Sequence, residues 1–486
     1  MPRFNHRLVA RLTSTLLLLA TLALLAPLAV SLRRADGAQY GIGIAAICIA
    51  TVGFLLRNVA GRHAINVIHE RESFWLTLVI WVTIPLTCAL PYLFTGSLTR
   101  VTDAIFESVS GFTTTGSSVA SDISSMPPSI LLWRAMTQWI GGLGLILFVI
   151  TFIWRHNTAA SELYAAEFSG TQQRKLHPHM AESVKRMWWI YSLLTILETI
   201  VLYACGNSIL DSVCLAMSTV STGGFTPAAN GLADCNEATH AVITVFMFTS
   251  GINVALIYNI FSLHWRRLRR NAEFVVYSLI FLIASLVCAI AFTVSGTPWW
   301  SSLRYSLFHI ASTISTCGFY TETPTQWPIL ASIITFILIL GGAMAGSTGG
   351  GIKLRRIMTM WLYLRNYFTH MLHPNAVFCI KIDRQVVDSE YVNKIFGFVF
   401  LYILFIIGGA FVLTLYGSGI ADAFCLSAAN ISNLGPSPII NSMGANLNYA
   451  LLPDGAKWTL MVLMLAGRLE IFALLAIVSP SYWKRQ

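Results

Sequence analysis

The sequence predicts an all-α polytopic membrane protein with four membrane-pore-membrane repeats in a pseudo-four-fold arrangement, preceded by an N-terminal two-helix hairpin. Of its 486 residues, 56% are hydrophobic and 11% are charged, whereas about a quarter of the residues in a soluble domain are charged. Apolar stretches long enough to cross a bilayer, which takes about 20 residues, recur along the chain. One short motif occurs four times between them, and this repetition organises the rest of the sequence.

The repeated motif is an amphipathic run that ends in polar or small residues and a glycine. The first copy is DAIFESVSGFTTTG at 103–116, and its closing glycine follows its opening residue by 13 positions. The same offset of 13 occurs in the other copies, which are DSVCLAMSTVSTGG at 211–224, YSLFHIASTISTCG at 305–318 and DAFCLSAANISNLG at 422–435. The closing glycines are 108, 94 and 117 residues apart, which is too far for a solenoid and suits repeated two-helix membrane units.

The apolar segments give the expected helices in chain order. Residues 12–31 and 41–57 form the leading hairpin, whose first apolar run exceeds the roughly 7–15 residues of a signal peptide and is read as an uncleaved helix. The repeats are expected to have helices at 74–96 and 131–154, 187–205 and 239–264, 274–296 and 328–360, and 394–416 and 456–480. We assign 1–72 to the N-terminal pair and 73–156, 157–270, 271–365 and 366–486 to pore repeats one to four.

The basic residues predict the topology. Twenty-four of the 31 Lys and Arg lie in alternate hydrophilic segments, namely the N-terminus, 57–71, 155–186, 266–270, 353–394 and the tail. Because cytoplasmic loops are enriched in Lys and Arg, these segments and both termini are predicted to be cytoplasmic. The net charge of +10 therefore reflects topology and not nucleic-acid binding, and all four motifs enter from the outer face.

The four loop ends suit a filter for a monovalent cation. A cation loses its hydration shell only if other oxygens replace water, and backbone carbonyls turned inward at a glycine do so without adding fixed charge. The preceding short helix would point its negative C-terminal dipole at the ion. A single loop of this kind is more simply a helix cap or turn. Four copies on one face favour loops that line a common pore, because irregular backbone at membrane depth must be buried in protein or face water.

The second helix of repeat three contains a further break. It is predicted to run from Trp327 to Met344, to open at 345–351 (AGSTGGG) and to resume at Ile352. Glycine costs a helix about 0.5–1 kcal/mol relative to alanine, so four glycines in six positions should unwind it. Openings of this kind in membrane helices are known locations for binding or gating elements.

Arg468 lies near the middle of the last predicted helix, with Glu470 close by. A central membrane arginine costs at least about 2.5–3.5 kcal/mol on insertion scales and is a functional-site hypothesis by default. A fixed positive charge below the filter would oppose cation passage and suit a gate. The alternative is structural: a buried Arg–Glu pair, or an arginine held by loop carbonyls for packing alone.

Other conspicuous residues have plainer interpretations. Asp103, Asp211 and Asp422 are expected at the starts of the short helices, where an acidic side chain is favoured, and attraction of cations to the outer mouth stays open as a second role. Gly141-Gly-Leu-Gly144 indicates close helix packing. The sequence from Gly346 to Lys353 lacks the spacing of a phosphate loop. Nine scattered cysteines without a C-x-x-C pair indicate neither a disulfide framework nor a metal site.

Several of these motifs together resemble a known family over the whole chain. They are SGFTTTG at 110–116, VSTGGFTP at 220–227, ISTCGF at 314–319, NISNLGP at 430–436, AGSTGGGIK at 345–353 and GRLEIF at 467–472. With the extra N-terminal helix pair, they are similar to the TrkH/KtrB/HKT superfamily of potassium transporters, and to the bacterial TrkH type within it.

The resemblance implies potassium uptake across the bacterial inner membrane, with K+ as the transported ion and no organic cofactor or nucleic acid. It implies a filter whose backbone carbonyls come from Thr114, Thr115, Gly116, Thr222, Gly223, Gly224, Thr316, Cys317, Gly318, Asn433, Leu434 and Gly435. The implied gate consists of Gly346, Ser347, Thr348, Gly349, Gly350 and Arg468. Similar proteins form homodimers and bind a cytoplasmic ring of nucleotide-sensing TrkA subunits.

Two details of the loops follow from the resemblance. Members with serine at the first filter glycine admit sodium, so Gly116 favours potassium. The fourth loop departs most, because Asn433 and Leu434 replace hydroxyl residues and Pro436 follows. Coordination there would rely on main-chain oxygens.

Two alternatives stay open at this stage. One is a symporter that couples potassium to protons or sodium. The other is a membrane-embedded enzyme that uses Arg468 and Glu470, against which the scarcity of titratable groups in the repeated loops argues.

Overall fold

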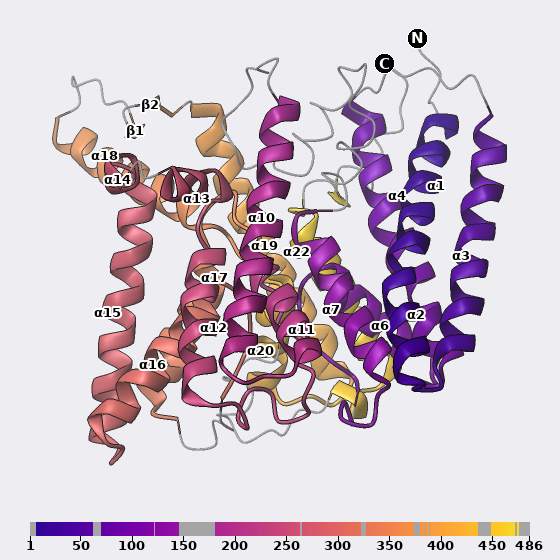
Figure 1. The fold of residues 1–486 in the computed structure, drawn as a ribbon. Coiled ribbons are helices and arrows are strands. Elements are labelled where there is room, and N and C mark those ends of the chain that lie inside the picture. The colour runs from indigo at the N-terminus through magenta and orange to yellow at the C-terminus, as the bar shows by residue number, and fades with distance from the viewer. Residues whose placement is uncertain are drawn as a thin grey trace, which may run out of the picture.

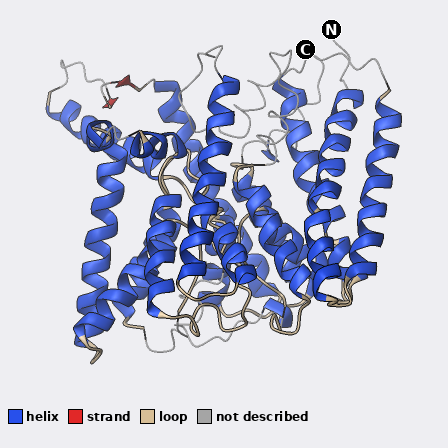
Figure 2. Cartoon of the chain, in the orientation of Figure 1, coloured by secondary structure: helices blue, strands red, loops and turns tan. Residues whose placement is uncertain are grey.

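The computed structural model describes residues 6–61, 70–120, 122–144, 180–262, 265–321, 327–373, 380–383, 385–387, 389–435, 449–471 and 474–475. These residues are mostly helical, with a single short hairpin of β1 (Lys381–Ile382) and β2 (Gln385–Val386) and a 3-10 turn at Tyr449–Leu451 (Figure 2). Six helical spans among them are long and apolar enough to cross a membrane, or up to seven if one bent pair counts as a span. The predicted all-α polytopic fold is confirmed.

The N-terminal pair stands at one side of the bundle (Figure 1). It consists of α1 (His6–Ala23), α2 (Leu25–Arg34) and α3 (Gln39–Ala60), and α1 packs along α3. The turn between α2 and α3 is fastened to repeat one, because the Asp36 carboxylate accepts a hydrogen bond from the Ser129 amide (3.1 Å). The predicted hairpin is therefore present, with a short interruption of its first helix at Leu24.

Each repeat begins with long helical segments and continues into a short helix. The long segments are α4 (Glu70–Cys88) with α5 (Leu90–Phe94), α10 (Met180–Ala204), α15 (Ala272–Val294) and α19 (Ser389–Leu415). The short helices are α6 (Val101–Phe112), α11 (Ile209–Val220), α16 (Trp299–Ile314) and α20 (Ile420–Ile431). Asp103, Asp211 and Asp422 lie in first turns, as predicted.

The second helix of every repeat stops or bends beside the end of a short helix. α7 (Pro128–Gly142) and α22 (Asp454–Arg468) end there. α12 (Glu237–Ser250) bends by 115° into α13 (Val254–Phe261). α17 (Ile329–Gly341) is separated from α18 (Leu354–Leu372) by residues 342–353.

These breaks correct three sequence predictions. Continuous helices at 239–264 and 456–480 are wrong, and the break in repeat three begins earlier than Ala345 and ends later than Gly351. The backbone departs from helical geometry at each break: Gly342 has φ +68°, Asn253 caps α13 by accepting from the Ala255 amide, and Glu470 adopts φ +53°. Residues 145–154 of the helix predicted at 131–154 lie outside the described residues.

The short helices pack in a closed ring. Each contacts the second helix of its own repeat and that of the preceding one, so that α11 touches α7, α16 touches α12, α20 touches α17 and α6 touches α22. Ion pairs reinforce the ring: Lys457 pairs with Asp103 (2.6 Å), and Arg304 pairs with Glu237. The buried Lys457 neutralises Asp103, which leaves that carboxylate little role in attracting cations.

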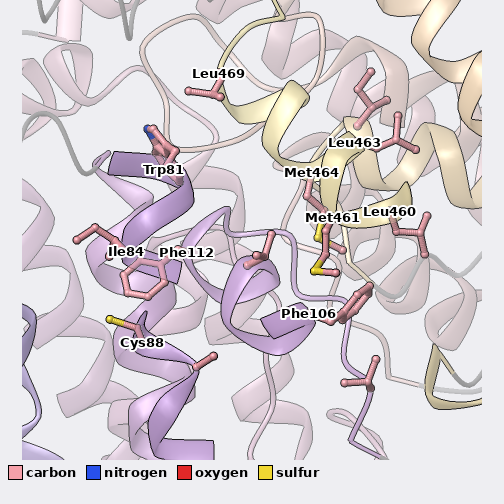
Figure 3. Packing of buried hydrophobic residues seen from close by; sticks show 14 of the residues in the cluster. Trp81, Ile84, Cys88, Phe106, Phe112, Leu460, Met461, Leu463, Met464 and Leu469 are labelled. Carbon is pink, nitrogen blue, oxygen red and sulfur yellow. The ribbon is translucent and has the colours of Figure 1, made fainter. Parts of the chain in front are cut away.

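Figure 3 shows the packing that joins repeats one and four, in which α4 and α6 meet α22 through Trp81, Phe106, Phe112, Met461 and Met464. Lipid tails are as apolar as these side chains, so helix association depends on close contact and hydrogen bonding. Glycines permit that contact. A Cβ on Gly141 would overlap the Phe112 carbonyl, and one on Gly467 would overlap that of Ile431. The predicted close packing at Gly141 is present.

Basic helices gather at one end of the molecule. α14 (Trp265–Arg269), α18 and the β-hairpin lie at the top of Figure 1, whereas the short helices lie in its lower half. The basic segments 266–269 and 353–365 therefore share one side of the bundle, as the positive-inside rule requires.

Candidate functional site

Four turns with the same backbone follow the four short helices. The residue two positions before each closing glycine is left-handed, with φ of 56° at Thr114, 56° at Thr222, 62° at Thr316 and 51° at Asn433. A non-glycine residue in this region costs about 1–3 kcal/mol and persists where surrounding structure enforces it. The same conformation occurs at four equivalent positions, which indicates that the four loops have a common structural role.

The hydrogen bonds of these turns are also equivalent. The amide of the next residue reaches back five positions in every copy, from Thr115 to Ser110 (2.9 Å), Gly223 to Ser218 (2.8 Å), Cys317 to Ser312 (2.9 Å) and Leu434 to Ala429 (2.9 Å). The fourth loop thus has the same turn despite its different side chains. It departs at Gly435, which lacks the positive φ of Gly116 (84°), Gly224 (82°) and Gly318 (88°).

The loop ends abut one another in a closed circle. A Cβ built on Gly116 would overlap the Gly223 carbonyl oxygen, and one on Gly224 would overlap that of Cys317. Gly318 faces the main chain of Gly435, whose own Cβ would lie 2.5 Å from the Thr115 oxygen. Segments more than 300 residues apart therefore meet, and the four loop ends that contain the predicted filter residues come together in one ring.

Buried polar side chains behind the loops hold them in place, and the sequence analysis missed them. The Gln138 amide donates to the Gly223 carbonyl (2.7 Å) and accepts from Ser218 (2.7 Å) and the Phe225 amide (3.2 Å). Arg134 pairs with Glu107 (2.8 Å), and both side chains are almost fully buried. Arginine and glutamine within an apolar helix were the available signal, since polar groups in membrane segments are costly.

Glu198 of α10 is a second buried acid that the sequence analysis passed over. It lies near Thr219 of α11 and Cys317 of the third loop. Within the part of the chain that the structure describes, neither of its carboxyl oxygens has a hydrogen-bond partner. Intramembrane acids of this kind mark proton pathways in many transporters.

Residues 342–353 separate α17 from α18 and lie directly against these loop ends. They include 345–351, where a gate was expected, and we call the whole segment the gating loop. The Gly350 amide donates to the Thr316 hydroxyl (2.8 Å), and the Thr222 hydroxyl donates to that of Thr348 (3.4 Å). A Cβ on Gly350 would also overlap the Ser432 carbonyl. The tip of this loop, from Gly346 to Gly350, therefore touches repeats two, three and four. Its glycines leave no space for side chains.

Arg468 fastens the gating loop to repeat one. Its guanidinium donates to the carbonyls of Thr348 (3.0 Å), Gly141 (2.6 Å) and Gly142 (2.8 Å). The prediction of a mid-helix position is wrong, because α22 ends at this residue. The contacts match the structural alternative of an arginine held by main-chain carbonyls, and Glu470 pairs with Arg356 (2.6 Å).

A cavity of about 70 Å³ lies between the gating loop and the ends of the broken helices. It has room for a few water molecules. Its charged lining residues are Lys353, Arg356, Arg468 and Glu470, so positive charge predominates. The Lys353 ammonium, at the end of the loop, donates to the Gly349 carbonyl. The loop and this positively charged cavity therefore lie side by side beneath the four loop ends.

Comparison with known proteins agrees with this geometry. The sequence model of the TrkH family, described as a cation transport protein, matches residues 43–485. The Trk system potassium uptake protein TrkH of Salmonella typhimurium is 30% identical over 99% of this chain and 100% of its own length. Its counterpart from Halomonas elongata is 31% identical over 99% of both chains.

A solved structure also matches. The crystal structure of the potassium transporter TrkH from Vibrio parahaemolyticus superimposes with a TM-score of 0.89 at 28% identity, covering 98% of this chain and 99% of the other. The family match, the relatives and the shared architecture agree over nearly the whole length. The chain belongs to the TrkH family of cation transport proteins.

Proposed function

We propose that this membrane protein takes up potassium across the bacterial inner membrane through a filter formed by its four loop ends. The observation that carries the proposal is the closed ring of four equivalent left-handed turns. Main-chain oxygens in such a ring can replace water around a dehydrated cation. The potassium uptake proteins among its relatives and the glycine at position 116 favour K+ as the ion.

The proposed filter residues are Thr114 to Gly116, Thr222 to Gly224, Thr316 to Gly318 and Asn433 to Gly435. The proposed gate is the tip of the gating loop, from Gly346 to Gly350, together with Arg468. Contacts of this tip with three filter loops support a closed state, in which it covers the inner end of the filter. Opening requires those contacts to break.

The proposed assembly follows the resemblance and the name of the Trk system. The chain forms a homodimer, binds cytoplasmic TrkA-type nucleotide-binding subunits, and has both termini in the cytoplasm. Its proposed units are the pair 1–72 and the repeats 73–156, 157–270, 271–365 and 366–486.

The enzyme alternative falls, because the family is one of transporters and not of enzymes. The symporter alternative stays, and Glu198 is the residue that gives it a physical basis. An intramembrane acid near the third loop, whose carboxyl oxygens have no hydrogen-bond partner among the described residues, is suited to carry a proton.

Purified protein in liposomes tests the proposal. We expect K+ flux down its own gradient without an accompanying change in pH or movement of Na+. Absence of K+ flux contradicts the proposal, and stoichiometric movement of H+ or Na+ selects the symporter. Uptake in a transport-deficient bacterium, with and without the regulatory subunit, then tests the partner.

A further inference from the structure

The gating loop leaves and re-enters the bundle at a single point, which we call the neck (Ala343, Ala345 and Leu354). The Leu354 amide donates to the Ala343 carbonyl (3.1 Å), and the Ile352 amide donates to that of Leu340 (3.1 Å). Compact loops with adjacent ends move as units when their ends are released. Whatever holds the neck therefore sets the position of the tip under the filter.

Glu273, in the first turn of α15, holds the neck. Its carboxyl group is almost fully buried and accepts a hydrogen bond from the Ala345 amide (2.7 Å). Arg355, which follows the loop at the start of α18, lies near the same carboxyl group. The Asn253 side-chain amide donates to the Ala345 carbonyl (2.6 Å). Glu273 and Asn253 thus hold Ala345 of the neck by its amide and its carbonyl.

The start of α15, which carries Glu273, is hydrogen-bonded to the β-hairpin. Asp383, an exposed residue at the hairpin turn, accepts from the Ala272 amide (2.9 Å) and from the Asn271 side chain (3.4 Å). Ala272 directly precedes Glu273 in the chain. The hairpin packs through Ile382 against a small cluster that includes residues of α18 and α19. Figure 1 shows it at the end of the molecule where the basic helices gather.

We propose that Glu273 is a positioning residue for the gate, and that displacement of the β-hairpin releases the gating loop through Asp383, the start of α15 and Glu273. The inference rests on the proposed function, and it assigns a route by which a partner at the basic face acts on the pore. Neither residue touches the ion path directly. Glu273 acts by holding the neck, and Asp383 acts through the start of α15, which carries Glu273. Loss of either side chain should therefore change how often the gate opens and leave the filter intact.

The test uses full-length protein in lipid, with Glu273→Ala, Glu273→Gln, Asp383→Ala and the Glu273→Ala/Asp383→Ala double variant. Asp234→Ala is the control, because this exposed acid bonds to Asn230 in the loop before α12 and lies away from the neck. Two quantities are measured: hydrogen–deuterium exchange of peptides covering 343–354, and K+ flux together with K+/Na+ discrimination.

Glu273→Ala should speed exchange at the neck and raise flux, each by about tenfold or more, because a bond from a carboxyl group to a buried amide is lost. Discrimination should be unchanged. The side-chain oxygen of Glu273→Gln can still accept a hydrogen bond, so its neck exchange and K+ flux should lie between those of Glu273→Ala and the parent. Asp383→Ala should raise neck exchange and K+ flux as well, but by less. The double variant should match Glu273→Ala alone, because the effects of substitutions in one network do not add.

Unchanged exchange and flux in Glu273→Ala would overturn the role of Glu273. Additive effects in the double variant, or no effect of Asp383→Ala, would overturn the link to the hairpin. If Glu273→Ala does not fold, Asp383→Ala, at an exposed position, still tests the link between the hairpin and the gating loop. Glu273→Gln then tests the role of Glu273 at the neck. Failure of the proposed function itself is distinguishable, because the parent protein would then carry no K+ flux, whereas neck exchange would still report on Glu273.

Discussion

Replacing Arg468 with alanine should raise potassium flux. Its hydrogen bond to the Thr348 carbonyl (3.0 Å) joins it to the gating loop, and its bonds to the Gly141 and Gly142 carbonyls hold the end of α7. A hydrogen bond to a charged group contributes about 1.5–3 kcal/mol. If this bond forms only when the loop is closed, its loss shifts the equilibrium toward the open state by about ten- to a hundredfold.

Two further variants separate charge from hydrogen bonding. Arg468→Gln keeps donors without the positive charge, and Arg468→Lys keeps the charge without the planar fork that reaches several carbonyls. We expect Arg468→Ala to show the highest flux, with both of the others between it and the parent.

The assay is K+ flux into liposomes of matched protein content, with thermal unfolding in detergent as a check on folding. K+/Na+ discrimination should stay constant, since the left-handed turns do not depend on this side chain. Flux at or below that of the parent in folded Arg468→Ala would refute the assignment of this residue to the gate.

Three other changes test separate parts of the account. Gly116→Ser places a Cβ against the Gly223 carbonyl at φ +84° and adds about 1–3 kcal/mol of strain. K+/Na+ discrimination, measured by flux or reversal potential, should therefore fall. Unchanged selectivity would contradict the filter assignment. Glu107→Gln leaves Arg134 buried without its ion partner. This change should cost about 3–5 kcal/mol of stability and lower the Tm. An unaltered Tm would contradict a stabilising role for the Arg134–Glu107 pair. Glu198→Gln should leave K+ flux and its pH dependence unchanged, whereas altered proton movement would favour the symporter.

The amino-acid pattern was sufficient for the repeated architecture because each copy is determined locally. The turn at Thr114 and its counterparts forms through hydrogen bonds within five residues, so a fixed spacing of glycine and polar residues predicts it in every repeat. The apolar segments similarly predict the long helices, since the bilayer demands length and hydrophobicity.

The breaks in the second helices could not be predicted in the same way. Asn253 ends one helix by contacts that include the distant Ala345 carbonyl, and Arg468 ends another where it meets carbonyls from repeat one. Such partners are unknown until the repeats pack together. Glu273 was missed for the same reason, because its hydrogen bond is to the backbone of Ala345, far along the chain. Gln138 stood out as a polar residue in an apolar helix, but its partner, the Gly223 carbonyl, is equally distant.

The most direct test of the central claim is to locate the ion. A crystal of the protein grown with Tl+ or Rb+ gives anomalous scattering that marks the cation independently of the protein density. We predict peaks on the axis enclosed by Thr115, Gly223, Cys317 and Leu434, at positions facing main-chain oxygens from all four loops. Peaks away from that axis, or none between the four loops, would contradict the account.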